Sequence, residues 1–300
     1  MGAGTFGRHH ATKYMRLPGV KLCAAADPSA DARRQVGSHL HIPVFADWRD
    51  LLGEVDLVSV CSPASTHAEI VRAFLLSGAH VLVEKPIATD LSEADELVKL
   101  ASDMNRVLTV GHQERFVFAR SGLLDFDETP LAVECVRAGP WTGRGTDVGV
   151  VLDLMIHDLD LIHRLVPGAV SDVEAVSRSV HGVLPDEVTA NLMFENGATV
   201  ELFASRAAEA RQRYMLVVYR DGMIEIDFLG RTVKNTTGHK LRPLELHDPL
   251  AESVGAFVAA VAGRAETLVR PEEARRALET ALLIEDAAVP MKKQAVRRVA

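Results

Sequence analysis

The sequence lacks the features that mark secreted, membrane-spanning and nucleic-acid-binding proteins. No apolar run approaches the roughly 20 residues of a membrane helix, and the N-terminus has no apolar signal segment. Acidic residues outnumber basic ones by 41 to 33, which argues against nucleic acid or an anionic membrane as the main partner. The three cysteines, Cys23, Cys61 and Cys135, each stand alone in a strand-like apolar run. They predict buried, reduced thiols in a cytoplasmic protein.

Internal repeats, low-complexity linkers and metal-binding spacings are also missing. Asp153 and His157 stand four residues apart, but no third and fourth ligand follows at a recognisable spacing, so we expect no metal site. What the chain does have is length and apolar content. Its 300 residues, 48% of them hydrophobic, are enough for two domains with large cores.

The first seven residues contain a G-x-G-x-x-G fingerprint. It consists of Gly2, Gly4 and Gly7, with Thr5 and Phe6 between the last two. In a dinucleotide-binding βαβ unit, the first glycine makes a tight turn, the second lets the backbone approach a pyrophosphate, and the third lets helix and strand pack closely. The phosphates then lie at a helix N-terminus, where free N–H groups favour negative charge. A hydrophobic strand should precede this fingerprint, and only Met1 does. We therefore expect the native chain to begin upstream of Met1.

Asp27 follows Gly7 by twenty residues, at the end of the apolar run 20–26. At this spacing a carboxylate accepts hydrogen bonds from the ribose 2′-hydroxyl of NAD, and it would repel the 2′-phosphate of NADP. Arg33 and Arg34 lie more than a helical turn further on and are poorly placed to bind that phosphate. The sequence therefore predicts NAD rather than NADP. The alternative is that Asp27 caps a helix that begins with Pro28.

Helix-like and strand-like segments alternate through residues 1–119. We expect strands at 20–26, 55–61, 81–83 and 107–110, and helices at 5–17, 30–39, 66–77 and 91–104. Repeated βα units predict a doubly wound parallel sheet of the Rossmann type, with its first strand truncated, and ligands of such sheets bind beyond the carboxyl ends of the strands. The polar residues at or just past those ends are Asp27, Ser62, His67, Glu84, Lys85 and His112.

The pattern changes in residues 120–300, where we expect a second, α+β domain. Strand-like runs occupy 131–136, 173–180, 188–194, 199–204, 215–219 and 223–228. Turns at Asn196-Gly197 and Asp221-Gly222 favour type I′ hairpins, and hence a mostly antiparallel, open sheet. Helices are expected at 250–261 and 271–288, where they can pack back on the first domain, and the basic tail 292–298 is expected to be a solvated end.

Two further features can support chemistry. Lys85, in Glu84-Lys85-Pro86 at a strand end, is a general acid or base when partly desolvated, or else a surface lysine in an ordinary X-Pro turn. Pro86 is a candidate for a cis peptide bond. The second feature is a predicted helix over 150–166, apolar on most of its surface, on which a polar stripe runs. Its members are Asp153, His157, Asp160 and Arg164. Such a stripe needs partners, which either a polar cleft or an internal row of ion pairs supplies.

Together these motifs resemble the glucose-fructose oxidoreductase, inositol dehydrogenase and rhizopine-catabolism family (Gfo/Idh/MocA). Six landmarks follow one another in family order: Gly2-x-Gly4-x-x-Gly7, Asp27, Ser62-Pro63-x-x-x-His67, Glu84-Lys85-Pro86, Gly111-His112-x-x-Arg115-Phe116 and Asp153-x-x-x-His157. At the position of Ser62 the family often has threonine. The resemblance covers nearly the whole chain, and it implies a Rossmann domain followed by an α/β domain whose open sheet joins subunits into a dimer or tetramer.

The activity that the resemblance implies is reversible hydride transfer between a nicotinamide ring and a carbinol carbon of a sugar or polyol. Lys85 would transfer the proton, His157 would hydrogen-bond the reacting hydroxyl and share or replace that role, and Asp153 would orient the pair. The residues expected at the cofactor are Gly2, Gly4, Thr5, Phe6, Gly7, Asp27, Ser62, Pro63, His67, Glu84, Lys85 and Arg115. The residues expected at the substrate are Lys85, His112, Arg137, Trp141, Asp153 and His157.

Within the family, residues 142–147 and 151–158 look like those of members that oxidise nucleotide-activated amino sugars, such as UDP-N-acetylglucosamine at its 3-hydroxyl. Arg137, Trp141 and Arg144 would then meet the diphosphate or uracil. One alternative is a free polyol such as myo-inositol as substrate. Another is a non-catalytic sensor of NAD or sugars with the same fold, which the presence of Lys85 and His157 disfavours. The resemblance thus implies an NAD-dependent enzyme with a small-molecule substrate, acting as a homo-oligomer.

Overall fold

The computed structural model describes residues 1–143, 145–244 and 247–291, which form two compact units. The first unit comprises Met1–Asp127, Ile156–Arg164 and Lys240–Glu279, and the second comprises the remaining segments. Ile156–Arg164 and Lys240–Glu279 therefore group with the N-terminal segment. The sequence predicted one boundary between residues 119 and 120, with closing helices that can pack back on the first domain. Arg144 and the basic tail lie outside the described residues. No helix in the described ranges is long and apolar enough to cross a membrane.

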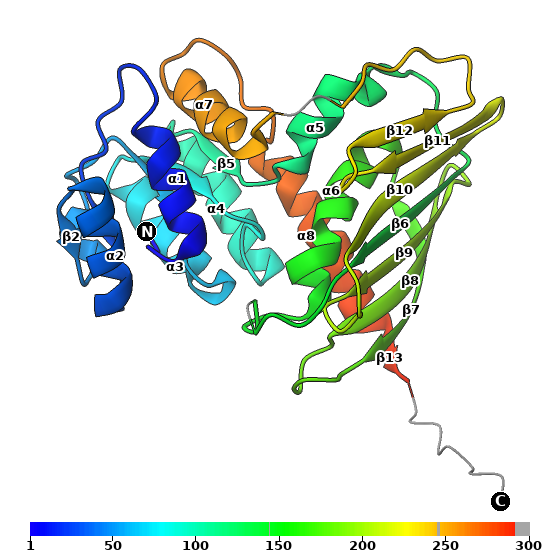
Figure 1. Cartoon of the computed structure of the whole chain (residues 1–300), viewed down its shortest axis with the longest axis horizontal. Helices are drawn as coiled ribbons and strands as arrows, with labels where there is room; N and C mark the ends of the chain where they lie inside the picture. The colour runs from blue at the N-terminus through cyan, green and yellow to red at the C-terminus, as the bar shows by residue number, and fades with distance from the viewer. Residues whose placement is uncertain (144, 245–246, 292–300) are drawn as a thin grey trace, which may run out of the picture. The chain divides into compact units, whose positions relative to one another are not determined.

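The strands of the first unit are all parallel and are divided between two sheets (Figure 1). A two-stranded sheet pairs β1 (Ala25–Ala26) with β2 (Val44–Phe45). A three-stranded sheet has the order β3 (Leu57–Val60), β4 (His80–Val83), β5 (Leu108–Val110). The doubly wound α/β class is confirmed, but the sheet is split between β1 and β3.

The expected strand over 20–26 is reduced to two residues, Ala25 and Ala26. These two pair with Val44 and Phe45 on one side only, because the strand expected on their other side is represented by Met1 and Gly2 alone. The expectation of buried thiols is therefore wrong for Cys23, which is exposed beside this unpaired run, and only Cys135 is fully buried. Cys61 is half-buried, and none of the three cysteines, all of which lie in the described ranges, forms a disulfide.

The helices of the first unit begin and end at the residues that helix capping favours. Asp90 accepts hydrogen bonds from the N–H groups of Ser92 and Glu93 at the start of α4, and Gly78, with φ +90°, follows the end of α3. The helices and the short 3₁₀ turns are α1 (Thr5–Tyr14), α2 (Ala30–Leu40), η1 (Trp48–Leu51), η2 (Ala64–Thr66), α3 (His67–Leu76), α4 (Leu91–Asp103), α5 (Glu114–Ser121), η3 (Leu123–Asp125), α6 (Ile156–Leu165), α7 (Pro249–Val261) and α8 (Pro271–Ala287), the last of which ends in the second unit.

Two apolar clusters hold the N-terminal part of the first unit together. Tyr14, Leu82 and Phe257 pack α1 and α7 against β4. Figure 1 shows α1 and α7 in this unit. Ala3, Ala11, Val36 and Leu40 join the glycine fingerprint to α1 and α2. The C-terminal helix α7 therefore belongs to the core of the N-terminal fold.

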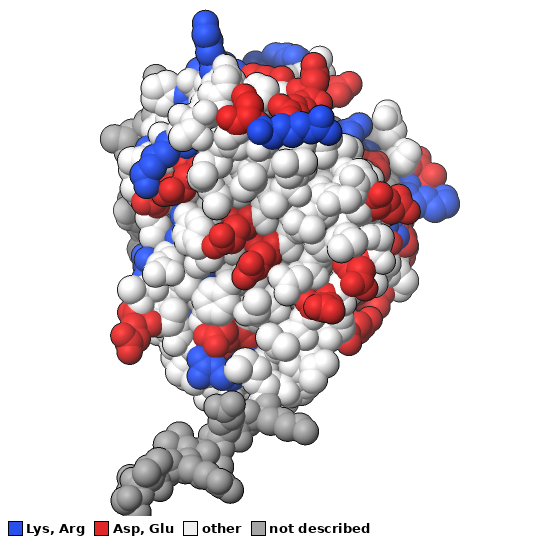
Figure 2. All heavy atoms as spheres, turned by 90° about the vertical axis from the view of Figure 1, so that its right-hand side faces the viewer, with Lys and Arg blue, Asp and Glu red and all other residues white. Residues whose placement is uncertain are grey.

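The second unit is built on one eight-stranded sheet of order β12-β11-β10-β6-β9-β8-β7-β13. Pairing is antiparallel except between β6 and β9 and between β7 and β13, so the expected mostly antiparallel sheet is confirmed. Figure 2 looks onto this side of the molecule, where uncharged side chains are interspersed with acidic ones. The strands are β6 (Ala132–Ala138), β7 (Val170–Arg178), β8 (Glu187–Phe194), β9 (Thr199–Ser205), β10 (Gln212–Tyr219), β11 (Gly222–Asp227), β12 (Thr232–Asn235) and β13 (Ala288–Pro290).

The predicted helix over 150–166 does not begin as an α-helix. Val151–Met155 form a π-helical turn, and α6 starts only at Ile156. The π turn holds extra backbone per turn, so the side chains of Asp153 and His157 do not follow the simple four-residue spacing of an α-helix. Such insertions are frequent at functional sites.

Candidate active site

The three glycines of the fingerprint have three different local environments, each matching its expected role. Gly2 has φ +80°, and a Cβ there would lie 2.6 Å from the carbonyl oxygen of Cys61. A Cβ on Gly7 would lie 1.8 Å from the Gly2 carbonyl oxygen, so helix and turn meet at van der Waals distance there. A Cβ on Gly4 would meet nothing within 4 Å. Gly4 therefore faces open space at the N-cap of α1, and helix N-termini of this kind favour anions.

Asp27 is held against the fingerprint by hydrogen bonds from two backbone N–H groups. Its Oδ2 accepts from the N–H of Ala3 at 2.7 Å, and its Oδ1 accepts from the N–H of Ser29 at 2.8 Å. The cap of α2 is Ser29, whose side chain accepts from Ala32, so the alternative that Asp27 is the helix cap is wrong. The carboxylate is thereby fixed at the end of β1, beside the glycine turn.

Glu84, at the end of β4, is tied to the fingerprint helix through His10. The His10 Nε2 lies 2.8 Å from Glu84 Oε1, and its Nδ1 lies 3.1 Å from Ser59 Oγ. His10 is only 2% exposed. Burial disfavours the imidazolium, but the Cys61 sulfur and the Glu84 carboxylate outweigh burial and raise the pKa of His10 to about 10. Gly111 makes room for this carboxylate, because a Cβ there would lie 2.5 Å from Glu84 Oε1.

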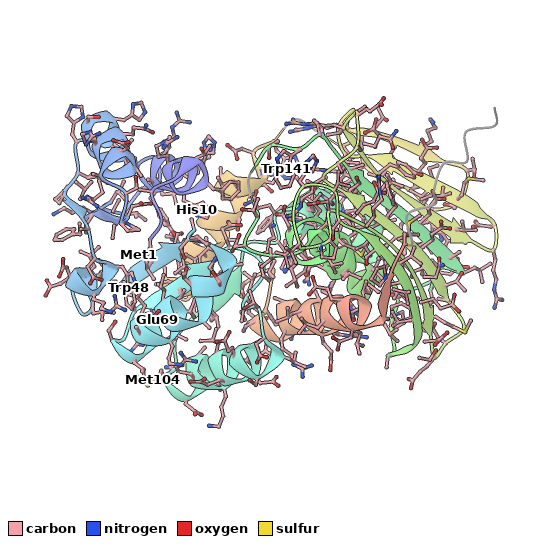
Figure 3. The ribbon with its side chains drawn as sticks, turned by 90° about the horizontal axis from the view of Figure 1, so that it is seen from below. Met1, His10, Trp48, Glu69, Met104 and Trp141 are labelled. Atoms are coloured by element: carbon pink, nitrogen blue, oxygen red, sulfur yellow. The ribbon has the colours of Figure 1, made fainter. Side chains whose placement is uncertain are left out.

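His10 and Ser59 were not singled out from the sequence. Both lie in segments that read as ordinary helix and strand, and their only signal is a polar residue on an otherwise buried face. Tyr14, one turn after His10, also reaches this point, with its hydroxyl 2.7 Å from Ser59 Oγ. Figure 3 labels His10 near Met1, the residue at the start of the fingerprint.

His67 anchors the loop that presents Lys85. Its Nδ1 lies 2.7 Å from the carbonyl oxygen of Pro86, and its Nε2 lies 3.0 Å from the carbonyl oxygen of Ser62. Burial lowers the pKa of His67, so the ring is neutral and donates to one of these two carbonyls. The Lys85–Pro86 peptide bond is cis, as the sequence suggested. The role of His67 is therefore to join the Ser62-Pro63 loop to the Lys85-Pro86 loop.

His112, at the end of β5, is buried with both ring nitrogens unsatisfied. It is 1% exposed, and neither Nδ1 nor Nε2 has a hydrogen-bond partner among the described residues. Burial lowers its pKa, and the charge of Lys85 acts in the same direction. Its ring meets that of His157 edge to face, with 6.3 Å between the ring centroids. A neutral imidazole with free nitrogens, beside a lysine and a second histidine, is suited to bind a hydroxyl group.

Arg115 forms a buried ion-pair network in the first unit. Its Nε and one terminal nitrogen donate to the two oxygens of Asp160 at 2.9 and 2.8 Å, and the other terminal nitrogen donates to Glu273 at 2.6 Å. Both Arg115 and Asp160 have side chains 1% exposed. Arg164 also donates to Glu273, at 3.1 Å. For Asp160 and Arg164, the polar stripe is thus an internal row of ion pairs. The expected contact of Arg115 with the cofactor stays a prediction.

The remaining substrate candidates lie in the second unit. Trp141 stacks on His181 with 4.3 Å between the centroids, and the guanidinium carbon of Arg206 lies 5.3 Å from the Trp141 ring centroid. Arg137 is 2% exposed on β6. Asp153 underlies the turn at Gly145, where a Cβ would lie 2.6 Å from its Oδ2. These side chains all lie in the second unit, whereas Lys85, His112 and His157 lie in the first.

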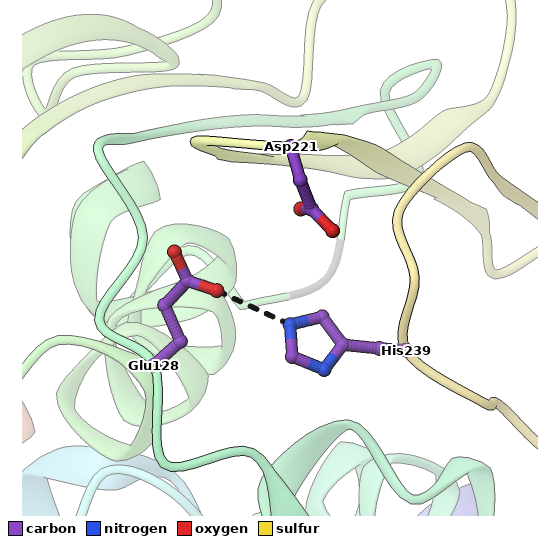
Figure 4. Close-up of side chains that lie close together, drawn as sticks. All are labelled: Glu128, Asp221 and His239. Atoms are coloured by element: carbon purple, nitrogen blue, oxygen red, sulfur yellow. Dashed lines mark hydrogen bonds and ion pairs between the residues drawn. The ribbon is translucent and has the colours of Figure 1, made fainter.

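The second unit also brings together three side chains of metal-ligand type, Glu128, Asp221 and His239 (Figure 4). One ligand atom from each lies within 4.8 Å of the others. Hydrogen bonds already account for the arrangement, since His239 Nε2 lies 3.3 Å from Glu128 Oε2 and Asp221 Oδ2 accepts from the Gly238 N–H at 2.8 Å. The sequence did not group these residues, because they come from three separate segments.

Comparison with known proteins places both parts of the chain in one family. Residues 1–112 match the model of an oxidoreductase family with an NAD-binding Rossmann fold. Residues 124–225 match the model of the GFO/IDH/MocA C-terminal domain.

Similar proteins include two kinds of sugar or polyol dehydrogenase. UDP-N-acetylglucosamine 3-dehydrogenase from Acidithiobacillus ferrooxidans is 32% identical over 297 residues, which cover 95% of this chain and 94% of that protein. Its crystal structure matches with a TM-score of 0.88 over 96% of this chain and 95% of the other. Inositol 2-dehydrogenase/D-chiro-inositol 3-dehydrogenase from Halalkalibacterium halodurans is 31% identical, over 60% of this chain and 54% of that protein.

The fold is also shared with a more distant enzyme. Scyllo-inositol dehydrogenase from Lactobacillus casei, solved with NAD(H) and scyllo-inositol, matches with a TM-score of 0.81 at 20% identity, over 96% of this chain and 95% of the other.

Proposed function

The chain belongs to the Gfo/Idh/MocA family of NAD-dependent oxidoreductases, and on that premise we propose that it oxidises a secondary hydroxyl of a nucleotide-activated amino sugar. The first candidate substrate is UDP-N-acetylglucosamine, oxidised at its 3-hydroxyl. The likeness to the enzyme of that name extends over 95% of the chain, whereas the likeness to the inositol dehydrogenase named above extends over 60%. A free polyol is the alternative substrate.

The observation that carries the catalytic proposal is the group formed by Lys85, His112 and His157. His112 is neutral and buried with free ring nitrogens, and it lies against His157 and within the electrostatic reach of Lys85. Oxidation of an alcohol requires a base for the hydroxyl proton while hydride leaves the carbon. Lys85 and His157 supply that base, and His112 orients the hydroxyl. NAD, when bound, accepts the hydride.

The cofactor side of the proposal is supported by the fingerprint geometry. Gly4 leaves open space at the N-terminus of α1, and Asp27 is held in place by the Ala3 N–H. The carboxylate of Asp27 favours NAD over NADP. Ser62, Glu84 and the loop at Pro86 line the nicotinamide end in this proposal.

We further propose a cytoplasmic homo-oligomer that associates through the open sheet of the second unit. The outward side chains of its central strands include Val136, Phe203, Leu216 and Val218, which are only partly buried in the described chain. Acidic side chains, Glu134 and Glu201 among them, are interspersed with these apolar ones on the same face. Partly buried apolar side chains with polar neighbours are found at interfaces between subunits.

The catalytic role of Lys85 is tested by substitution. We expect Lys85→Ala to lower turnover by at least about 100-fold while the Kd for NAD changes by less than a few-fold, because the lysine acts on the substrate proton. The matched control is Lys99→Ala, an exposed lysine paired with Asp103 on α4. Full turnover by the Lys85 variant would contradict the mechanism.

The substrate is tested by NADH formation with UDP-N-acetylglucosamine, UDP-N-acetylglucosaminuronate and myo-inositol at equal concentrations. We expect turnover with a UDP-sugar and none above background with myo-inositol. Turnover with myo-inositol alone would replace the nucleotide-sugar proposal by the polyol alternative. NAD binding without turnover of any sugar would favour a sensor.

A further inference from the structure

The side chains of Glu128, Asp221 and His239 converge in the second unit and take no part in the catalytic proposal (Figure 4). Glu128 lies on the segment that leads into β6, Asp221 lies in the turn between β10 and β11, and His239 follows the end of β12. Glu128 and His239 are half-buried, and Asp221 is exposed. One imidazole and two carboxylates are ligand types that Zn²⁺ uses in proteins.

The two carboxylates bring more negative charge to this point than the side chains around them neutralise. In the part of the chain that the structure describes, neither Glu128 nor Asp221 forms an ion pair with lysine or arginine. The basic side chain beside them is His239, whose Nε2 lies 3.3 Å from Glu128 Oε2. Carboxylates held close together repel one another unless a positive charge compensates them. A divalent cation would balance both.

The separations of the donor atoms are those that a zinc ion requires. Zinc binds histidine nitrogen and carboxylate oxygen at about 2.0–2.2 Å, so the ligand atoms of a tetrahedral site lie about 3.4 Å from one another. The distance of 3.3 Å between His239 and Glu128 has this value, and all three donor atoms lie within 4.8 Å of one another. A small rotation of the exposed Asp221 side chain would complete the set.

Backbone and side-chain hydrogen bonds hold the loop of His239 in place. Asn235 Oδ1 accepts from the Thr237 N–H at 2.9 Å, and Asn235 Nδ2 donates to the His239 carbonyl at 2.7 Å. Asp221 Oδ2 accepts from the Gly238 N–H at 2.8 Å. Asp221 Oδ1 accepts no hydrogen bond from a described residue, which leaves it for a cation. Supporting hydrogen bonds of this kind orient metal ligands and raise their affinity.

Two of the three residues stand where the chain passes from one unit to the other. Glu128 is the first residue of the second unit, and the chain returns to the first unit directly after His239. The Leu131 N–H donates to the Val218 carbonyl at 2.8 Å, so the segment that follows Glu128 runs beside β10. A cation shared by the three side chains would therefore fasten both passages of the chain to the turn between β10 and β11.

We propose that Glu128, Asp221 and His239 bind one Zn²⁺ ion, which acts as a structural clamp of the second unit. The imidazole favours Zn²⁺ over Mg²⁺ and Ca²⁺, which prefer oxygen ligands. The ion takes the place of the hydrogen bond between His239 and Glu128, and water completes its coordination. The site is separate from Asp153 and His157, for which the sequence predicted no metal.

Calorimetric titration of the chelator-treated full chain with Zn²⁺ tests the proposal. We expect one equivalent to bind to the native chain, and Mg²⁺ and Ca²⁺ at the same concentration to show no binding. Asp221→Asn keeps an acceptor for the Gly238 N–H but loses the charge, and His239→Gln removes the imidazole. Each is expected to weaken Zn²⁺ binding by at least about 10-fold. The matched controls are Asp172→Asn and His39→Gln, at exposed positions outside the site, which are expected to bind like the native chain.

Thermal unfolding gives a second readout. Zn²⁺ at about 100 times its Kd is expected to raise the Tm by about 5 °C in the native chain and the controls, and by less than about 1 °C in the two ligand variants at the same concentration. Without Zn²⁺ the variants are expected to melt within about 2 °C of the native chain, and if one does not fold, the other decides. No binding by the native chain, or full binding by a folded ligand variant, would overturn the proposal. Neither measurement uses a turnover assay, so the result is independent of the substrate.

Discussion

At the scale of single residues, substitution of two fingerprint glycines is expected to have different effects, one on cofactor binding and the other on stability. Gly4 has φ −62°, and nothing lies within 4 Å of its Cβ position, so alanine fits there without a clash in the folded chain. The same methyl group would occupy the space that the pyrophosphate needs. Gly7 has no such freedom, because its Cβ position overlaps the Gly2 carbonyl.

We expect Gly4→Ala to weaken NAD binding by at least about 10-fold while the free energy of unfolding changes by less than about 1 kcal/mol. Gly7→Ala is expected to lower the free energy of unfolding by about 2–4 kcal/mol, because turn and helix must move apart. Isothermal titration with NAD and urea unfolding measure the two effects. The reverse pattern, with Gly4→Ala unfolded and Gly7→Ala stable, would contradict this assignment.

His10 makes the stability of the first unit depend on pH. Its pKa is raised from 6.5 to about 10 in the folded chain, so the stabilisation is fully present below pH 6.5 and is lost as the pH rises towards 10. We expect the free energy of unfolding to fall between pH 7 and pH 10 in the native chain and to fall less in His10→Gln. His9→Gln, at the exposed neighbouring position, is the control. Parallel pH profiles for all three proteins would contradict the ion pair with Glu84.

Residues at strand ends could be predicted from the sequence, and their partners could not. Asp27, Glu84, Lys85 and His112 follow buried strands, and parallel sheets gather such residues at one edge. Arg115 was predicted to contact the cofactor because it belongs to a family motif. Its ion-pair partners, Asp160 and Glu273, lie 45 and 158 residues away in the sequence and were not predicted. Contacts over such separations depend on the packing of helices, which a local pattern does not specify.

At the scale of elements, the Arg115 network joins three helices: α5, α6 and α8. Removing one partner of a buried ion pair leaves the other charge uncompensated, whereas replacing both by apolar groups is often neutral. We expect Arg115→Met to lower the free energy of unfolding by about 3–5 kcal/mol, and Arg115→Met with Asp160→Leu to recover most of that loss. Glu273 keeps Arg164 and Arg270 as partners in both variants.

Guanidinium chloride unfolding of the two single variants and the double variant measures this coupling. The double variant is also expected to bind NAD within a few-fold of the native chain, because the guanidinium of Arg115 donates to Asp160, Glu273 and the Leu268 carbonyl. A strong loss of NAD affinity in a well-folded double variant would restore Arg115 as a cofactor ligand.

The turn residues in the sequence predicted the positions of two hairpins correctly, β8–β9 and β10–β11. The turn types differ from the prediction. A type I′ turn needs positive φ at both central residues, and Asn196 and Asp221 do not have it. Gly197, with φ +86°, follows Asn196, and the Gly197 N–H donates to Phe194, which is typical of a type I turn with a bulge. An Asn-Gly pair is compatible with both turns, so the sequence located the reversal without defining its geometry.

At the scale of the whole molecule, the sequence predicted the order of elements and allowed the closing helices to pack back on the first domain. It did not predict that Ile156–Arg164 groups with the first unit. Alternating βα units and a later run of strands predicted the two architectures, because apolar periodicity reports on burial within each element. The grouping of α7 with the N-terminal fold depends on Tyr14, Leu82 and Phe257 meeting across more than 240 residues. A helix of apolar character can pack on either unit, and only the complementary surface decides.

Association through the open sheet is tested with one substitution on its outward face. We expect the native chain to sediment as a dimer or tetramer, and Leu216→Glu on β10 to shift it to monomer, because a carboxylate would be buried between subunits. Glu201→Gln, on the same face of β9, is the control and is expected to keep the oligomer. A native chain that sediments as a monomer at micromolar concentration would contradict this interface.

The hydrogen bond between His10 and Glu84 links the cofactor and substrate sites that we propose. His10 lies on α1, whose first turn would hold the pyrophosphate, and Glu84 directly precedes Lys85. We expect a shift of α1 on NAD binding to displace the loop of Lys85 through this contact. Thermodynamic reciprocity then requires that the sugar raise the affinity for NAD by the same factor by which NAD raises the affinity for the sugar. We expect both factors to approach one in His10→Gln.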